Sequence, residues 1–355
     1  MAKNFSLAWS GENREFHGRV NMFFGVAATC LAGMMRRESK THMKKTFFLF
    51  LSTLVLSLIA AGLGGETDPA KAGPEYQVQG EYAGKGIGVQ VIALGDGNYR
   101  AVIHKGGLPG DGWDKSAKVE INGKASAAGA AFAEAKGWKG AIAGKIFEIS
   151  SPDGANRLEK VMRKSSSLGM KPPKGAVVLF DGSSAKNFKP GKMTEDGLLM
   201  QGANSIQRFG DHRLHIEFRL PFKPKARGQG RGNSGCYLQA RYEVQMLDSF
   251  GLTGHHNECG GIYSIKPPDL NMCYPPLSWQ TYDVEFTAAK FKDGKKVEDA
   301  RITVFHNGVK IHNNVKLPKR TTASPLPEGP EPGFLHLQNH GNPVRYRNIW
   351  VVEKK

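Results

Sequence analysis

The sequence has few cysteines, and no two of them form a Cys-x-x-Cys pair. Only four cysteines occur in 355 residues. The chain therefore gives no support to a zinc ribbon or to a thioredoxin-type redox site. No phosphate-binding loop pattern, no internal repeat and no run of basic residues interleaved with aromatic ones is found either. The sequence thus offers no motif for binding nucleotides or nucleic acids.

Acidic residues are also scarce relative to basic ones. The chain has 49 lysines and arginines but only 32 aspartates and glutamates, so its formal net charge is +17. A positive surface attracts anions, and nucleic acid is the generic partner of such a surface. The export signal described next makes nucleic acid a poor partner, and we predict none. An acidic polysaccharide or a charged envelope is the better expectation, and plain solubility is the alternative.

No apolar run is long enough for a typical membrane span of ~20 residues. Met43-Lys44-Lys45 is followed by an uncharged stretch from Phe47 to Ala61 and then by small residues up to Gly65. This order is typical of a secretory signal peptide, which we place at 43–65. An uncleaved anchor is the alternative, but no stable membrane anchor is expected. Because no cysteine lies near the cleavage region, a lipoprotein anchor is not expected either.

Residues 1–42 precede this signal and show no clear structural period. A signal peptide begins a chain, so we interpret 1–42 as a non-native upstream extension and Met43 as the true start. The protein is then exported, to the periplasm or the extracellular space. Three cysteines remain in the exported part, namely Cys236, Cys259 and Cys273. One disulfide is allowed there; Cys259–Cys273 is the more local pair, although the pairing stays open.

The composition after the signal indicates two β regions joined by a linker. Short strand-like runs and turns predict a small accessory β domain at 75–163, although the Ala-rich piece from Ala125 to Lys136 is also compatible with a helix. Residues 164–175 contain Ser-Ser-Ser and Pro-Pro and indicate a linker. The second region, 176–355, has many alternating strands and a strong hairpin signal at Asn307-Gly308. The sequence therefore predicts an all-β protein with an antiparallel sandwich or jelly roll.

The most informative segment runs from Asn233 to Asp248. In Tyr242-Glu243-Val244-Gln245-Met246 the side chains alternate, so Glu243 and Gln245 share one face of a strand and Val244 and Met246 the other. Asp248 falls one residue out of phase, and a β-bulge would return it to the polar face. A polar row of this kind suits a sugar-binding cleft, and an ordinary solvated strand is the alternative.

The second region resembles a known family through an ordered set of short motifs. These motifs are Leu179-Phe180-Asp181-Gly182, His215-Ile216-Glu217-Phe218-Arg219, Asn233-Ser234-Gly235, Tyr242-Glu243-Val244-Gln245, Gly260-Gly261-Ile262-Tyr263, Trp279-Gln280-Thr281-Tyr282-Asp283, Asn307-Gly308, Gln338-Asn339-His340-Gly341 and Arg347-Asn348-Ile349. Their order is similar to that of the 3-keto-disaccharide hydrolase family, also described as 3-keto-glycoside lyase/hydratase domains. The resemblance covers about residues 176–353. With the signal and the preceding β domain, the chain resembles exported planctomycete-type members.

The resemblance implies a fold and a reaction. The implied fold is a concanavalin A-like jelly roll at 176–355, preceded by the small β domain. The implied substrate is a glycoside or oligosaccharide oxidised at C3, and the implied reaction is β-elimination followed by hydration, which together amount to hydrolysis. A sugar 3-oxidoreductase acting upstream is then an expected partner.

Such a reaction needs a base, an acid and a group that polarises the ketone. Our candidates are His340 as the base, Glu243 as the acid and Arg347 as the group that holds the enolate oxygen. A loop histidine and a buried hydrogen-bonded carboxylate are the plain alternatives for His340 and Glu243. The predicted substrate-binding residues are Asn233, Gln245, Asp248, Tyr263 and Gln338, and Asp248 could also orient Arg347.

The sequence leaves the cofactor and the class of protein open. A divalent cation held by carboxylate and histidine would act as a Lewis acid, and the other expectation is no cofactor. His255-His256 with Glu258 is a weak transition-metal candidate, because adjacent histidines on a strand point in opposite directions. A conventional retaining glucanase is disfavoured, since Gln245 stands where a second carboxylate is needed. The alternative to an enzyme is a non-catalytic carbohydrate-binding or envelope-associated jelly-roll module.

Overall fold

The computed structural model describes residues 65–354. The predicted upstream extension, 1–42, and all of the predicted signal peptide except Gly65 lie outside the described residues. Within 65–354, the helices are too short or too polar for a membrane span. The described residues belong to one compact unit, Ala60–Lys355.

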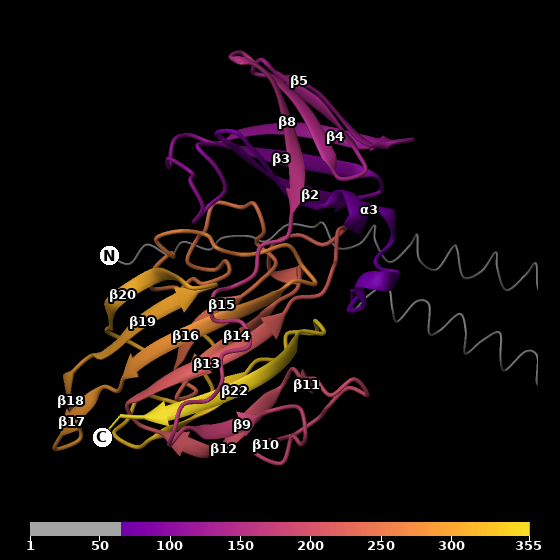
Figure 1. Cartoon of the computed structure of the whole chain (residues 1–355). Coiled ribbons are helices and arrows are strands. Elements are labelled where there is room, and N and C mark those ends of the chain that lie inside the picture. Colours follow the sequence, from indigo (N-terminus) through magenta and orange to yellow (C-terminus); the bar gives the residue numbers. More distant parts are fainter. Residues whose placement is uncertain (1–64, 355) are drawn as a thin grey trace, which may run out of the picture. The chain divides into compact units, whose positions relative to one another are not determined.

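The first part is a closed antiparallel barrel of eight strands in which β1 pairs with β8 (Figure 1). Two short helical pieces precede it, η1 (Pro69–Lys71) and α3 (Gly73–Val78). The strands are β1 (Gly80–Gly84), β2 (Ile87–Gly95), β3 (Asn98–Lys105), β4 (Val119–Ser126), β5 (Gly129–Ala135), β6 (Trp138–Ala143), β7 (Ile146–Ser151) and β8 (Gly154–Val161). The helix considered for Ala125–Lys136 is wrong, because these residues form the end of β4, a turn and β5. Alternation decides the structure here: Ala130 and Phe132 point into the barrel core and their neighbours point outward.

The second part is a sandwich of two antiparallel sheets. One sheet has the order β10-β12-β21-β14-β15, and the other has the order β11-β22-β13-β16-β19-β20 with β9 paired to β22 (Figure 1). The strands of the five-stranded sheet are β10 (Phe188–Lys189), β12 (Ala203–Phe209), β14 (Ser234–Leu238), β15 (Tyr242–Met246) and β21 (Gly333–Leu337). The strands of the seven-stranded sheet are β9 (Val177–Phe180), β11 (Leu199–Met200), β13 (His212–Arg219), β16 (Trp279–Thr287), β19 (Ala300–His306), β20 (Val309–Leu317) and β22 (Arg345–Glu353). A small hairpin, β17 (Lys290–Lys292) and β18 (Lys295–Glu298), and a 3-10 turn, η2 (Gly228–Gly230), complete the part of the chain that the structure describes.

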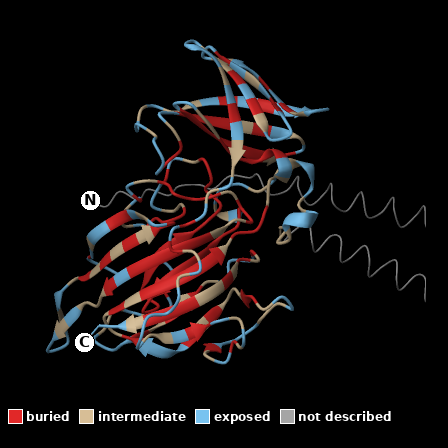
Figure 2. Ribbon diagram, in the orientation of Figure 1, coloured by how far each residue is buried: buried red, intermediate tan, exposed pale blue. Residues whose placement is uncertain are grey.

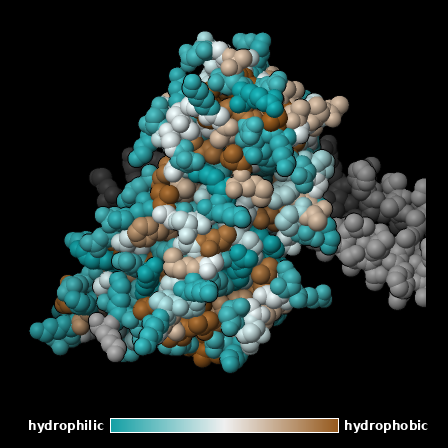
Figure 3. All heavy atoms as spheres, viewed as in Figure 1, coloured by the Kyte–Doolittle hydropathy of each residue, from teal (hydrophilic) through white to brown (hydrophobic). Residues whose placement is uncertain are grey.

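The sandwich core lies between the two sheets. Side chains from both sheets form one apolar cluster, for example Val244 on β15, Leu337 on β21 and Val284 on β16. The middle strands of the sandwich are accordingly mostly buried, as Figure 2 shows. Burying such side chains removes apolar surface from water, at roughly 25 cal/mol per Å². On the exterior face seen in Figure 3, hydrophilic residues predominate and hydrophobic ones form small separate patches. The predicted all-β fold, a concanavalin A-like sandwich after a small β domain, is confirmed.

The hairpin predicted at Asn307-Gly308 joins β19 and β20. Both residues have positive φ, 52° for Asn307 and 82° for Gly308, as a two-residue turn between twisted strands requires.

The segment 164–175, predicted as a linker, packs on the outer face of the seven-stranded sheet. The Ser165 hydroxyl lies 2.6 Å from the Thr281 hydroxyl, and the Gly169 N–H donates to a Glu217 carboxylate oxygen at 2.6 Å. The segment is therefore part of the sandwich surface as well as a connection.

Cys236, Cys259 and Cys273 are buried free thiols. Cys259 and Cys273 lie close enough to hydrogen-bond each other, so the two residues predicted as a local pair are neighbours, although no disulfide joins them in this structure.

Candidate functional site

One row of side chains crosses the outer face of the five-stranded sheet. Glu243 on β15 lies opposite Tyr237 on β14, and Tyr237 lies opposite His336 on β21. His336 in turn lies opposite Asn204 on β12. Directly paired residues point to the same side of a sheet, so these four side chains form one continuous row, here named the Glu243 row. The alternation predicted for Glu243 and Gln245 against Val244 and Met246 agrees with this arrangement.

Glu243 is a buried carboxyl group with little to stabilise its charge. Its residue is 3% exposed, and within residues 65–354 no cation lies within ion-pair distance of it. Burial raises the pKa of Glu243 to about 8, although a hydrogen bond from the Tyr237 hydroxyl lowers it in part. A carboxyl group with this pKa is largely protonated at neutral pH and can donate a proton.

A glycine makes room for that carboxyl group. A Cβ atom on Gly235 would lie 2.1 Å from Oε1 of Glu243 and 2.8 Å from a ring carbon of Tyr237. The neighbouring strand must therefore lack a side chain at this position for the Glu243–Tyr237 contact to form.

His336 occupies the middle of the row and is neutral at physiological pH. Its Nδ1 lies 2.6 Å from Oδ1 of Asn204, and its ring centroid lies 5.1 Å from that of Tyr237. Burial lowers the pKa of His336 to about 4. Because an amide oxygen only accepts hydrogen bonds, Nδ1 of His336 carries the proton and donates a hydrogen bond to Oδ1 of Asn204. The lone pair of Nε2 is then free for a substrate.

A set of amides extends the site beside the row. Nδ2 of Asn233 donates to Oε1 of Gln229 at 2.9 Å, and Nε2 of Gln245 donates to the same oxygen at 3.0 Å. Oδ1 of Asn233 is buried and has no partner among the described residues. Such an orphaned acceptor is unfavourable unless a donor reaches it, and a sugar hydroxyl would be one.

Two further predicted binding residues lie close to the row. Nε2 of Gln338 donates to the Tyr237 hydroxyl at 3.2 Å. The Tyr263 backbone N–H donates to the Glu243 carbonyl at 3.3 Å, so its loop runs along the edge strand β15. Four of the five predicted binding residues thus gather around Glu243, namely Asn233, Gln245, Tyr263 and Gln338.

Asp248 lies elsewhere, because β15 ends at Met246 and no bulge returns the chain to the polar face. The Asp248 carboxylate accepts from Nε of Arg231 at 2.7 Å, and the Arg231 guanidinium also donates to the Ala93 carbonyl of the barrel at 3.2 Å. Asp248 therefore pairs with Arg231 and not with Arg347, and this buried ion pair ties the sandwich to the barrel.

The three predicted catalytic residues do not meet in one place. His340 is an exposed residue in the loop after β21. Arg347 lies on β22, in the other sheet, and its Nε donates to a carboxylate oxygen of Glu217 at 2.6 Å. Only Glu243 of the three lies in the row.

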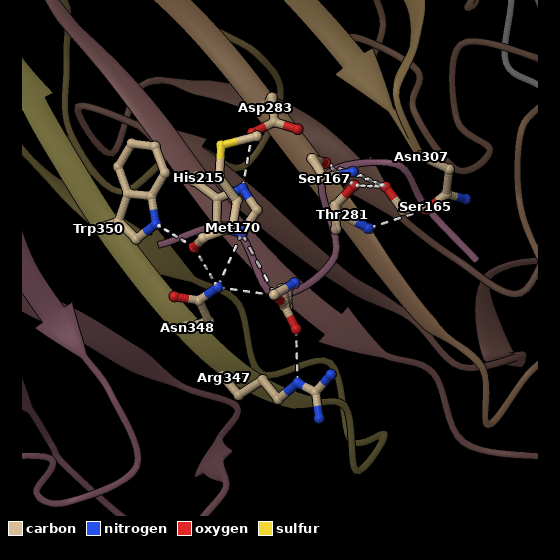
Figure 4. A network of polar contacts seen from close by, with 12 residues as sticks. Ser165, Ser167, Met170, His215, Thr281, Asp283, Asn307, Arg347, Asn348 and Trp350 are labelled. Atoms are coloured by element: carbon tan, nitrogen blue, oxygen red, sulfur yellow. Dashed lines mark hydrogen bonds and ion pairs between the residues drawn. The ribbon is translucent and has the colours of Figure 1, made fainter. Parts of the chain in front are cut away.

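Arg347 belongs to a second polar cluster, on the outer face of the seven-stranded sheet (Figure 4). This Arg347 network comprises His215, Glu217, Asp283, Arg347, Asn348 and Trp350. Nδ1 of His215 lies 2.8 Å from an Asp283 oxygen, and Nδ2 of Asn348 donates to Glu217 at 2.9 Å. Although burial raises the pKa of Glu217, hydrogen bonds from His215, Asn348 and Arg347 lower it to about 2.

Neither region offers a good site for a metal ion. In residues 65–354, no three His, Cys, Asp or Glu side chains are grouped as metal ligands. The Glu258 carboxylate accepts from the Gly254 and His255 backbone N–H groups, and His255 and His256 are exposed. In the Glu243 row, Tyr237 separates the carboxyl group from the imidazole. The side chains of the Glu243 row therefore do not form a set of ligands that fits a divalent cation. A divalent cofactor stays a prediction from the sequence alone.

Sequence reasoning missed Tyr237, His336 and Asn204. The signal for His336 was present, because Phe334 and His336 alternate with Leu335 and Leu337 along β21, and Gln338 continues the pattern just past its end. The pairing of β21 with β14, which brings His336 beside Tyr237, joins residues 99 positions apart and has no local signature.

Comparison with known proteins identifies a matching family. The family model described as "3-keto-alpha-glucoside-1,2-lyase-like domain" matches residues 175–352. No curated protein matches. Among solved structures, a Parabacteroides distasonis protein named a "putative glycosyl hydrolase" is 31% identical, with 51% of this chain and 85% of that chain covered and a TM-score of 0.48. A second structure from that organism, with the same name, is 18% identical, covers 51% and 95% of the two chains and has a TM-score of 0.37.

The family match spans about half of the chain and coincides with the sandwich that carries the Glu243 row. The chain therefore belongs to the family of 3-keto-α-glucoside-1,2-lyase-like domains.

Proposed function

We propose that the Glu243 row cleaves 3-keto-glycosides by β-elimination and then hydrates the product, giving net hydrolysis. The observation that carries this proposal is a buried carboxyl group whose pKa is raised to about 8, in one row with a neutral histidine. An acid and a base with separated pKa values are what an elimination near neutral pH requires. Family membership and the names of the similar structures support a carbohydrate-active protein.

The base in this mechanism is His336. A ketone at C3 acidifies the hydrogen at C2, and Nε2 of His336 accepts that proton. The hydrogen bond from Nδ1 to Asn204 holds the imidazole in the required tautomer and stabilises the imidazolium that forms.

The acid is Glu243. As the C2–H bond breaks, the C1=C2 double bond forms and the C1–O bond breaks, and protonated Glu243 gives its proton to the departing oxygen. The Gln338 amide lies beside it. One of its N–H groups donates to the Tyr237 hydroxyl, which itself donates to Glu243, and the second N–H is available to the ketone oxygen as negative charge develops there.

Hydration reverses these roles. The Glu243 carboxylate takes a proton from water, whose oxygen bonds to C1 of the enone. The imidazolium of His336 returns its proton to C2. The products are a 3-keto sugar and the released alcohol, so the elimination and the hydration together consume one water molecule.

A sugar 3-oxidoreductase acting upstream follows from this chemistry, because the C3 ketone must be formed by an oxidation. Export to the periplasm or the extracellular space stays a prediction from residues 43–65.

The test is turnover of a panel of 3-keto-disaccharides, with sugar release and enone absorbance followed together. Glu243→Gln and His336→Gln should each lower kcat about 10²–10⁴-fold, and Asn204→Ala less. The profile of kcat/KM against pH should fall below about 4, as His336 is protonated, and above about 8, as Glu243 loses its proton. Turnover that survives both substitutions would remove the row from the mechanism.

The second candidate function is a non-catalytic carbohydrate-binding module. It is favoured by the exposure of His340 and by the position of Arg347 in the other sheet. Saturable binding of glycans with no turnover across the panel, with and without added divalent cations, would establish this alternative.

A further inference from the structure

Two arginines pack on one indole on the outer face of the seven-stranded sheet, and a third arginine lies beside them. Arg219 on β13 lies directly opposite Trp279 on β16 and opposite Arg345 on β22. Arg347 follows two residues along β22 on the same face. The guanidinium carbon of Arg347 lies 4.1 Å from the Trp279 ring centroid, and that of Arg219 lies 5.0 Å from it.

The charges of this arginine cluster (Arg219, Arg345 and Arg347) are mostly unpaired. Within residues 65–354, only Arg347 has a carboxylate within ion-pair distance, that of Glu217. Arg345 donates to the Gln201 side chain at 2.8 Å and to a backbone carbonyl, both of them neutral. Nε of Arg219 is buried with no partner in the described part of the chain, a costly state for a charged group. The pKa of Arg219 is lowered, chiefly by burial and also by the nearby charge of Arg347. Asp196 and Asp68 raise this pKa in part, although both lie beyond ion-pair distance.

Donors are also left over on Arg347. Figure 4 shows its Nε directed at the network, while its two terminal nitrogens point away with no contact drawn. A carboxylate or sulfate group could accept two parallel N–H bonds from such a guanidinium.

A cavity of about 340 Å³ adjoins Arg347. Its walls include Glu217 and Asn348 from the sheet, Met170 and Lys171 from the 164–175 segment, and Asp181. Arg219, Arg345 and Trp279 do not line this cavity, so it lies beside the arginine cluster and shares Arg347 with it. Its wall adds one cation, Lys171, and one anion, Asp181, whereas Glu217 is already paired with Arg347.

We propose that Arg219, Arg345, Arg347 and Trp279 form a second saccharide subsite, which binds a sugar unit carrying an oxyanion. The guanidinium groups bind the oxyanion. Trp279 positions two of them, because the guanidinium groups of Arg347 and Arg219 lie over its ring. The oxyanion is either a uronate carboxylate or a sulfate ester. The subsite lies in a different sheet from the Glu243 row. Because no cation of the described residues lies within ion-pair distance of Glu243, the subsite binds an acidic part of a glycan independently of the proposed cleavage.

The experiment measures binding to the purified protein by calorimetry at low and at high salt. The probes are an oligogalacturonate and a sulfated chondroitin oligosaccharide, with a methyl-esterified and a desulfated counterpart and inorganic sulfate as controls. We expect an acidic oligosaccharide to bind, more weakly at high salt, and its uncharged counterpart not to bind. Whichever of the two acidic probes binds identifies the oxyanion.

The variants are Arg219→Gln and Arg345→Gln, and the matched control is Arg213→Gln. Arg213 lies on the same strand and face as Arg219, 5.8 Å from the Trp350 ring centroid, and has no carboxylate within ion-pair distance in the described residues. Each of the first two changes should weaken binding about 10-fold, and the control should leave it unchanged. Turnover at the Glu243 row should persist in all three variants.

Arg345 is half-buried and hydrogen-bonds only to neutral groups, so its variant should fold even if Arg219→Gln does not. The proposal is overturned if neither acidic oligosaccharide binds, if Arg213→Gln weakens binding as much as Arg345→Gln, or if inorganic sulfate binds as tightly as the oligosaccharides.

Discussion

Glu217 and Glu243 are both buried glutamates on the outer faces of the sandwich, yet their environments act in opposite directions. Glu217 is 1% exposed and Glu243 is 3% exposed. Burial raises the pKa of each carboxyl group, but the pKa of Glu217 ends at about 2 and that of Glu243 at about 8. Burial alone therefore does not decide the protonation state; the partners do.

The histidines of the two regions differ in the same way. Burial lowers the pKa of both His215 and His336. Hydrogen bonds to the Asp283 and Glu217 carboxylates reverse this effect for His215 and raise its pKa, whereas His336 bonds to the neutral Asn204 and its pKa stays at about 4. The Arg347 network is thus a set of paired charges that stabilises the fold. The Glu243 row is a set of neutral groups that can exchange protons.

The largest expected effect comes from changing the two glutamates separately. Glu243→Gln should lower turnover of a 3-keto-disaccharide about 10²–10⁴-fold and leave the fold intact. Glu217→Gln should leave turnover per folded molecule unchanged and lower the free energy of unfolding by about 1–3 kcal/mol, because it breaks charged hydrogen bonds. Kinetics and urea denaturation of both variants measure this contrast. A loss of activity in Glu217→Gln at full stability would show that the two faces are not separate.

Gly235→Ala should have the next largest effect. The added Cβ would lie 2.1 Å from Oε1 of Glu243, so the carboxyl group must move away from Tyr237. A displacement of about 1 Å can lower activity about 10²-fold. The matched control is Gly210→Ala, since a Cβ there would meet no atom within 4 Å. Kinetics of both variants, beside their thermal unfolding, would show whether the row tolerates the methyl group.

Arg347→Met tests the charged face. The change keeps an apolar side chain on Trp279 but removes a donor from buried Glu217, so we expect a loss of about 1–3 kcal/mol in the free energy of unfolding. Arg213→Met is the control, with an expected change below about 0.5 kcal/mol because no carboxylate depends on it. Equal stabilities of the two variants in urea would contradict the role given to the Glu217–Arg347 pair.

The smallest and most specific effect is on the pH dependence of stability. Glu217 has a lowered pKa, so its stabilisation is present above the unfolded value near 4.5 and is lost as pH falls toward about 2. Glu243 has a raised pKa, so the folded state holds its proton more tightly, and stability is lost as pH rises from about 4.5 to about 8. Glu243→Gln should therefore become more stable than the wild type as pH rises through this range. Denaturation curves at pH 5, 7 and 9 would reveal the divergence, and parallel curves would refute the raised pKa.

Much of the fold was predictable from local patterns. Alternation in Tyr242–Met246 identified the polar face of β15, and Asn307-Gly308 identified a hairpin whose two positive φ angles the structure confirms. Ala125–Lys136 was ambiguous, because an Ala-rich segment suits a helix by propensity. Its place in the closed barrel decided for strand β5.

The composition of the site was less predictable. The sequence did indicate three amide residues of the site. They lie on or directly beside strands that alternation reveals: Asn233 next to β14, Gln245 on β15 and Gln338 next to β21. The sequence indicated His340 as the base and missed His336, four residues away, since nothing local shows which of the two reaches Tyr237. The predicted role of Arg347, holding the enolate oxygen, would place it beside Glu243, whereas its actual partner is Glu217.

The sequence by itself determined the strands, their polar and apolar faces and the family, because side-chain alternation and turn residues act over a few positions. Only the tertiary structure decided which polar faces meet. Strand order joins residues far apart in the sequence. It set His336 beside Tyr237, 99 positions away, in one sheet and Arg347 beside Glu217, 130 positions away, in the other. The pKa values of Glu217 and Glu243 follow from those neighbours, so no local pattern could have told the paired carboxylate from the proton donor.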